Sequence, residues 1–147
     1  MPTLHLGVID LPYTDETGVT TGDVAGWLED KYHILETFAQ EHEQEIAADL
    51  ENGLGGALEN LMMGAPSAGA DPFAGAAAKI EEKMKDFISN NEMAMLGYPG
   101  VPTKAALDRA AGRRRSARMS KKRSSNAVAV SFYDSGLFQS SLTAWVE

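Results

Sequence analysis

Residues 21–52 carry the feature that most constrains the fold of this chain. Their apolar side chains recur at helical spacing, and Glu and Asp fill the opposite side. Thr20 with Asp23 three residues later predicts the helix start, as a carboxylate variant of the capping box. We expect a helix over 21–63 that Gly53, Gly55 and Gly56 break or kink. The apolar stripe consists of Val24, Trp27, Leu28, Leu35, Phe38, Ile46 and Leu50.

Shorter elements flank this helix. Residues 1–12, which include LHLGVIDLP, predict a short strand or an extended arm. The small, Pro- and Gly-punctuated segment 64–78 predicts a flexible loop. A second amphipathic helix follows over 79–90, and its apolar stripe is formed by Ile80, Met84, Phe87 and Ile88.

The last third of the chain is harder to assign. Thr103 is placed to cap a short helix that Gly112 ends. A basic loop over 112–126 leads into 127–147, which begins with strand-like alternation. From Leu137 the pattern fits either a helix that turns into a strand or one continuous strand, and the two alternatives stay open.

Composition restricts the class of protein. A chain of 147 residues is typical of one domain, and an aromatic content of 7% with abundant Ala and Gly favours helices. No window has the length of a membrane span, and the N-terminus lacks the pattern of a signal peptide, so we expect a soluble, unprocessed protein. The absence of Cys excludes disulfides and thiolate metal sites and fits a reducing cytosol.

Charge is unevenly distributed along the chain. Residues 1–100 hold 18 acidic and 4 basic side chains, whereas 101–147 hold 3 acidic and 9 basic ones. Such an asymmetry favours either an internal contact or complementary faces of neighbouring subunits. Seven of the basic residues are clustered in one stretch: Arg113, Arg114, Arg115, Arg118, Lys121, Lys122 and Arg123.

This basic stretch has two interpretations. Clustered Arg and Lys can neutralise nucleic-acid phosphates and release counterions. However, no aromatic residue lies between 109 and 131 to stack on bases, and the remaining acidic chain repels a polyanion. We therefore favour a solvated loop that becomes ordered near acidic side chains, and keep DNA contact as the alternative.

Residues with catalytic or metal-binding chemistry are few. The three histidines are His5, His33 and His42, and the last two are nine residues apart, too far for a two-His metal motif on one helix. No G-x-S-x-G elbow and no phosphate-binding loop occurs. We expect no catalytic residues, no metal and no cofactor. An unrecognised enzyme would need a pocket with convergent polar groups. Trp27 and Trp145 are interpreted as anchors in a core or an interface.

Four segments near the two ends of the chain are distinctive: GVIDLPY and TTGDVAGWLEDKYHILETF at the start, GYPGVPTKAAL at 97–107, and SFYDSGLFQSSLTAWVE at 131–147. Together they resemble a group of small tailed-bacteriophage virion proteins. The turn Asp134-Ser135-Gly136-Leu137 followed by Ser140 is also similar to a D-T-G-x-L-x-x-S-I signature of head–tail joining and tail-completion proteins. Here Ser135 stands where Thr is usual, and no Arg follows Leu137.

The resemblance implies an α+β fold, with a long amphipathic helix packed on a small antiparallel sheet, and with extended termini and loops that reach neighbouring subunits. It implies a non-enzymatic structural protein of the virion, assembled in the host cytoplasm as a six- or twelve-fold ring. Its role there is that of a connector, tail-completion or tail-terminator protein. Expected partners are other copies of the chain, a portal adaptor or tail tube, and packaged DNA touched non-specifically, with no membrane. The alternative function is a small nucleic-acid-binding or regulatory protein that acts through 113–123.

The turn signature has a structural meaning of its own. Asp134 is suited to cap a turn or a following helix. Gly136 permits a positive φ or a close backbone approach. Ser140 is suited to satisfy a buried backbone group. We expect the segment to reverse the chain at a sheet edge. Because one copy offers the terminal segments little apolar surface and exposed strand edges invite pairing, we also expect the N-terminal arm or the C-terminal strand to dock on an adjacent subunit.

Overall fold

A computed structural model describes residues 2–13, 18–64, 71–104, 106–108, 111 and 136–147. It has the expected α+β composition, with helices and one antiparallel sheet of two strands. The elements in chain order are β1 (Leu4–Val8), α1 (Thr21–Tyr32), α2 (Ile34–Glu41), α3 (Glu43–Met62), α4 (Ala74–Ser89), α5 (Glu92–Met95), α7 (Leu137–Ser141) and β2 (Leu142–Val146).

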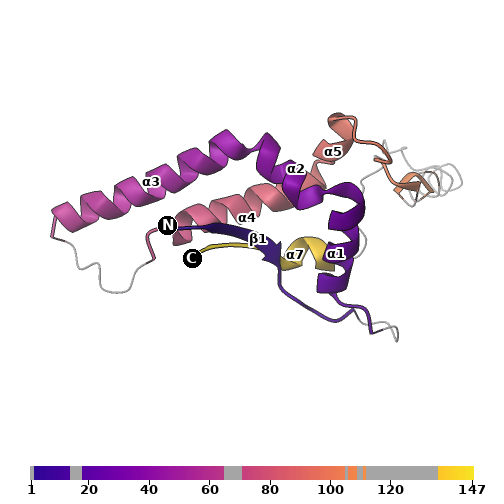
Figure 1. Cartoon of the computed structure of the whole chain (residues 1–147), viewed down its shortest axis with the longest axis horizontal. Coiled ribbons are helices and arrows are strands. Elements are labelled where there is room, and N and C mark those ends of the chain that lie inside the picture. Colours follow the sequence, from indigo (N-terminus) through magenta and orange to yellow (C-terminus); the bar gives the residue numbers. More distant parts are fainter. Residues whose placement is uncertain (1, 14–17, 65–70, 105, 109–110, 112–135) are drawn as a thin grey trace, which may run out of the picture.

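The elements are stacked in layers around α4 (Figure 1). One side of α4 packs on β2, and α3 packs against α4 from the other direction. Helix α1 stands at one end, where it contacts α7. The helix that lies on the sheet is therefore α4, whereas α3, the longest helix, is one layer further out. No described helix is long and apolar enough to cross a membrane.

The sheet joins the two ends of the chain. Leu4 pairs with Val146, Leu6 with Ala144 and Val8 with Leu142, in antiparallel register. Because side chains alternate along a strand, these residues share the face toward the core, where Leu142 and Ala144 are buried. The expected terminal strand is thus confirmed for β1, and its partner is β2 of the same chain.

The core is formed mainly by α2 and α4. Phe38 and Phe87 meet edge to face, with ring centroids 5.6 Å apart. All four residues of the predicted stripe on the second helix, Ile80, Met84, Phe87 and Ile88, are buried. These contacts confirm the helical period that the sequence predicts for this segment.

The predicted start of the first helix is confirmed. The hydroxyl of Thr20 accepts a hydrogen bond from the Asp23 backbone N–H at 3.3 Å, and the Asp23 carboxylate accepts one from the Thr20 N–H at 3.1 Å. This reciprocal capping box satisfies two backbone donors that have no partner within the helix.

The predicted helix breaks are wrong. The chain turns at His33, which adopts a left-handed conformation with φ 50° and ψ 50°, and bends again at His42. Helix α3 instead continues through Gly53, Gly55 and Gly56. After these breaks, Phe38 of α2 and Ile46 of α3 both lie in the buried core together with Phe87 of α4.

The predicted loop 64–78 is too long at its C-terminal end, because α4 begins at Ala74. Ala76 and Ala77 are buried in its first turns. The Gly53 position of α3 lies close to this start, since a Cβ placed there would be 3.5 Å from the Cβ of Ala76. Small residues on both helices therefore allow this close approach, and tertiary packing extends the helix beyond its predicted start.

The ambiguity near the C-terminus is decided in favour of a helix that turns into a strand. Helix α7 ends at Ser141, and β2 begins at Leu142 with φ −61° and ψ 135°. The hydroxyl of Ser141, which is buried, donates to the Phe138 carbonyl at 2.7 Å. The Ser141 carbonyl accepts from the Ile9 N–H, also at 2.7 Å, so the junction is tied directly to the end of β1.

Candidate functional site

The seven basic residues between Arg113 and Arg123 lie outside the described residues, as do Asp134 and Ser135. The described part of the turn signature behaves as a structural element. Gly136 is the N-cap of α7 with φ 82°, which confirms the expected positive φ. Ser140 donates to the Leu137 carbonyl at 2.9 Å from an exposed position, so the buried hydroxyl is that of Ser141 and not of Ser140.

The two tryptophans lie at the surface. Trp27 on α1 is 60% exposed and Trp145 on β2 is 41% exposed, so neither is a core residue. The alternative interpretation, anchors in an interface, is the one compatible with these positions.

The outer face of the sheet is built around Trp145. The imidazole of His5, its cross-strand partner, stacks on the indole with centroids 5.3 Å apart and planes inclined by 11°. His5 Nε2 also lies 3.7 Å from a carboxylate oxygen of Glu147. The indole covers Gly7 as well, since a Cβ there would be 3.2 Å from two ring atoms. A flat aromatic surface on the side of the sheet away from α4 is the result.

A second exposed apolar surface lies on the C-terminal half of α3. We define the α3 stripe as Leu54, Leu58, Leu61 and Met62. The three leucines are 54–56% exposed, and Met62 is 81% exposed. Exposed apolar residues that are contiguous on one side of a helix are typical of an interaction surface. Sequence reasoning missed this stripe, although the spacing i, i+4, i+7, i+8 was its signal.

The opposite side of α3 is fixed to α4 by charged residues. Lys83 Nζ lies 2.8 Å from Asp49 Oδ2 and 2.9 Å from Glu45 Oε2. The hydrogen bond from Lys83 lowers the pKa of both carboxyl groups, and the bonds to Asp49 and Glu45 raise the pKa of Lys83. Lys79 adds a longer contact to Asp49 at 3.8 Å. These pairs orient α3 on α4 and leave the α3 stripe directed elsewhere.

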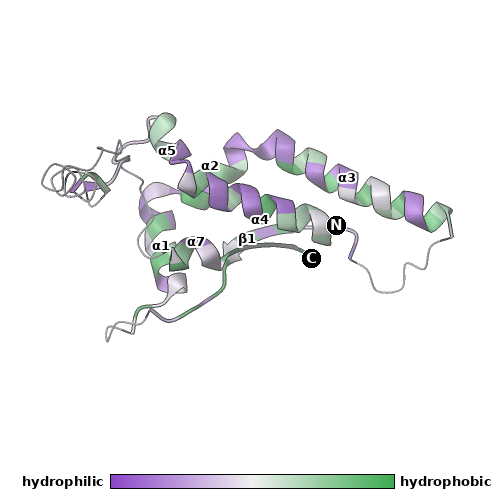
Figure 2. Cartoon of the chain, turned by 180° about the vertical axis from the view of Figure 1, so that it is seen from behind, coloured by the Kyte–Doolittle hydropathy of each residue, from purple (hydrophilic) through white to green (hydrophobic). Residues whose placement is uncertain are grey.

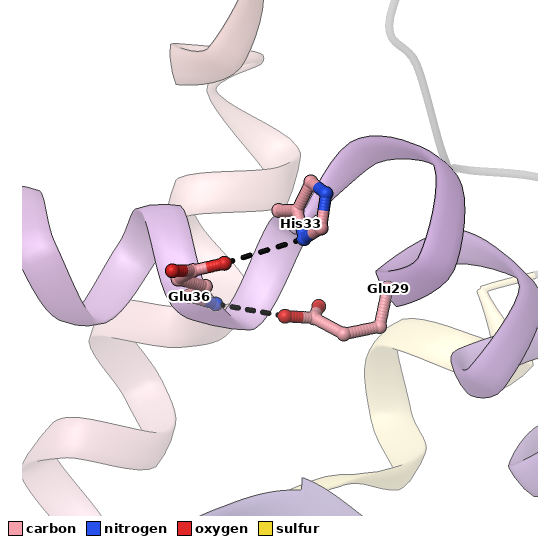
Figure 3. A group of neighbouring side chains, drawn as sticks. All are labelled: Glu29, His33 and Glu36. Atoms are coloured by element: carbon pink, nitrogen blue, oxygen red, sulfur yellow. Dashed lines mark hydrogen bonds and ion pairs between the residues drawn. The ribbon is translucent and has the colours of Figure 1, made fainter.

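A group of one histidine and two glutamates lies where α1 meets α2 (Figure 3). His33 Nδ1 is 3.2 Å from Glu36 Oε2, and Glu29, His33 and Glu36 can each bring one ligand atom within 4.8 Å of the others. The spacing i, i+4, i+7 was a signal that sequence reasoning did not use.

The main role of Glu29 in this group is to cap α2. Its two carboxylate oxygens accept the backbone N–H groups of Leu35 at 2.8 Å and Glu36 at 3.1 Å. An acceptor at this position satisfies free donors of the first turn. His33 and Glu36 are exposed. The arrangement is therefore explained by the turn between the two helices, and we assign no metal to it.

The His42 side chain is only 18% exposed, although glutamates surround it in the sequence. Its ring packs on Phe38 at 4.9 Å and meets Phe87 edge to face at 5.8 Å. Its Nε2 lies 3.2 Å from the carboxylate of Glu92 on α5. The residue thus ties the α2–α3 bend to α5, whereas the neighbouring Glu41, Glu43 and Glu45 are exposed and form a solvated acidic face.

The described residues therefore present exposed apolar side chains on α1, α3 and β2. Comparison of the chain with protein-family models, with curated proteins and with solved structures gives no match in any of the three.

Proposed function

We propose that this protein is a non-enzymatic structural protein of a tailed-bacteriophage particle. Copies of it form a ring that joins or completes the neck or tail end, as a connector, tail-completion or tail-terminator protein. The observation that carries the proposal is the resemblance of both chain ends to such virion proteins. The N-terminal and C-terminal segments that carry this resemblance contact each other in the folded chain, because β1 pairs with β2 and α1 contacts α7.

The exposed apolar surfaces support the proposal. Trp27, Trp145 and the α3 stripe place large apolar side chains in solvent on three separate elements. A subunit of a ring uses at least two different surfaces, one for each neighbour, and further surface for the proteins above and below it. Residues 1–100 carry a net negative charge and residues 101–147 a net positive one. Attraction between these parts of neighbouring subunits would select which surfaces meet in the ring.

The direct test is peptide mass spectrometry of purified particles of the phage whose genome encodes the chain. We expect its peptides at a constant ratio to those of other neck or tail proteins. A reconstruction of the same particles then locates the ring. Particles that lack the chain contradict the proposal. Neighbouring genes that encode capsid and tail proteins would support it, and early regulatory genes would speak against it.

The clustered charge of 113–123 favours a second candidate function, binding of nucleic acid. Seven Lys and Arg side chains in eleven positions are a dense source of phosphate contacts. The expected signature is affinity for duplex DNA that falls steeply with added salt and disappears when all seven are changed to Gln. Fluorescence anisotropy with labelled DNA measures both. Binding that is unchanged in the Gln variant would contradict this candidate.

A further inference from the structure

The α3 stripe is an apolar surface on a helix that already has another packed side. Ile46 is buried, and Asp49 pairs with Lys83 of α4. At about 100° per residue, Leu58 lies roughly 180° around the helix from Asp49, and Leu54 roughly 140° from it. The stripe therefore faces away from α4 and is not the edge of the core contact.

The position of α3 in the fold leaves this surface accessible. Its C-terminal half projects beyond the start of α4, as both views of the chain show (Figures 1 and 2). Figure 2 also shows that hydrophobic residues continue along α3 to its far end. Four large apolar side chains at one end of a projecting helix need a partner that buries them.

The charges around the stripe restrict the chemistry of that partner. Helix α3 carries acidic residues and no Lys or Arg; Glu59 lies among the stripe residues in the sequence, and Glu51 lies three residues before the first of them. Two such stripes placed against each other would bring acidic helices together. A segment that combines basic and apolar side chains fits better, because it pairs charges around the buried leucines.

The chain itself contains such a segment. The seven basic residues of 113–123 are followed closely by Ala127, Val128, Ala129, Val130, Phe132 and Tyr133. The described helices that flank this segment in the chain, α5 and α7, lie at the end of the molecule opposite to the C-terminal end of α3 (Figure 1). This arrangement favours contact between different copies over contact within one copy.

We propose that the α3 stripe is a docking surface for residues 113–133 of a second copy of this chain. The contact is head-to-tail: each copy offers its stripe to one neighbour and its basic–apolar segment to the next. Repetition of such a contact gives a ring if the rotation closes and a filament if it does not. The contact holds whether or not the protein is part of a virion.

Site-specific cross-linking tests this contact, because the chain has no Cys. One preparation carries Leu58→Cys and a second carries Val130→Cys. An affinity tag makes the second chain longer, so that the two chains and their mixed dimer separate by size. The mixture is oxidised at low salt and separated without reductant. We expect a mixed dimer of L58C with V130C as the main product, and a ladder of oligomers from the L58C/V130C double variant.

The matched control is Glu59→Cys, which is adjacent to Leu58 and roughly 100° away around the helix. We expect at least tenfold less mixed dimer from E59C with V130C. Leu54→Ser with Leu61→Ser, both at exposed positions, should reduce the L58C–V130C product tenfold while the helical circular dichroism stays unchanged.

Three outcomes overturn the proposal. Dimers of L58C with itself, without a mixed product, indicate that two stripes pair. A disulfide within one copy of the double variant, with no product in the mixture, places the contact inside the chain. No cross-link up to the solubility limit excludes the contact. Mass spectrometry of particles is a separate measurement, so failure here leaves the proposed virion role to be judged independently.

Discussion

The indole of Trp145 covers Gly7 of the neighbouring strand, at a distance that leaves little space for a Cβ. The same indole stacks on His5, so one exposed aromatic ring contacts both outward-facing positions on β1. This contact ties the last strand to the first on the side of the sheet that α4 does not cover.

The two tryptophans therefore differ in what they contribute to stability. Trp145→Ala removes the cross-strand contacts with His5 and Gly7, and we expect a loss of about 1 kcal/mol in the free energy of unfolding. Trp27→Ala, at a more exposed position on α1, is the control and should change it by less than about 0.5 kcal/mol. Urea titration followed by circular dichroism measures both. Equal losses would contradict the role assigned to Trp145.

Thr21 is predicted to anchor the segment after β1. Its buried hydroxyl donates to the Ile9 carbonyl at 2.7 Å and accepts from the Leu11 N–H at 2.8 Å. Thr21→Val keeps the shape but removes both bonds, so we expect a loss of about 1–3 kcal/mol in the free energy of unfolding. Thr21→Ser keeps the hydroxyl and should lose about 1 kcal/mol for the missing methyl group. If the Ser variant is the less stable one, the hydrogen bonds are not the reason for this Thr.

The glycines of α3 provide a test of helix packing. A Cβ on Gly53 would lie 3.0 Å from the Pro72 carbonyl oxygen, whereas a Cβ on Gly55 meets nothing within 4 Å. Gly55→Ala should therefore raise the free energy of unfolding by roughly 0.5–1 kcal/mol. Gly53→Ala should give no such gain, because backbone must move. A gain of the same size from both would show that α3 does not approach Pro72 closely in solution.

The Lys83 contacts with Asp49 and Glu45 are expected to make stability depend on pH at both extremes. The pKa of Asp49 is lowered from 3.8 by the Lys83 hydrogen bond, so its contribution is present above pH 3.8 and is lost as the pH falls through the lower folded-state value. The pKa of Lys83 is raised from 10.5, so its contribution is present below pH 10.5 and is lost as the pH rises through the higher folded-state value.

Lys83→Met should therefore lose roughly 1 kcal/mol in the free energy of unfolding between pH 5 and 10, and less in acid. Denaturant titrations of both proteins at pH 2, 3, 7 and 9 measure the difference. Lys85→Met is the control, because Lys85 pairs with Glu81 on the same helix and does not bridge α3 and α4. A difference between K83M and the unchanged protein that is constant down to pH 2 would contradict the assignment.

Local signals in the sequence determined several elements correctly. The capping box at Thr20, the buried stripe of 79–90 and the positive φ of Gly136 each depend on neighbouring residues only, and each is confirmed. The division of the C-terminus into α7 and β2 was not decided in this way. It depends on β1, which lies more than a hundred residues earlier in the chain and supplies the hydrogen-bond partners of β2.

The tertiary structure alone decided where the first helix breaks and which surfaces stay exposed. His33 carries no strong local signal for a left-handed conformation, and it adopts one where α2 turns toward α4 and Glu29 caps the new helix. Gly53 lies inside α3 without ending it, and its missing side chain lets the Pro72 carbonyl oxygen approach to where a Cβ would be only 3.0 Å away. The leucines of the α3 stripe resemble core residues in the sequence. They are exposed because α4 occupies a different side of the helix, and a one-dimensional pattern does not specify which apolar side a neighbour covers.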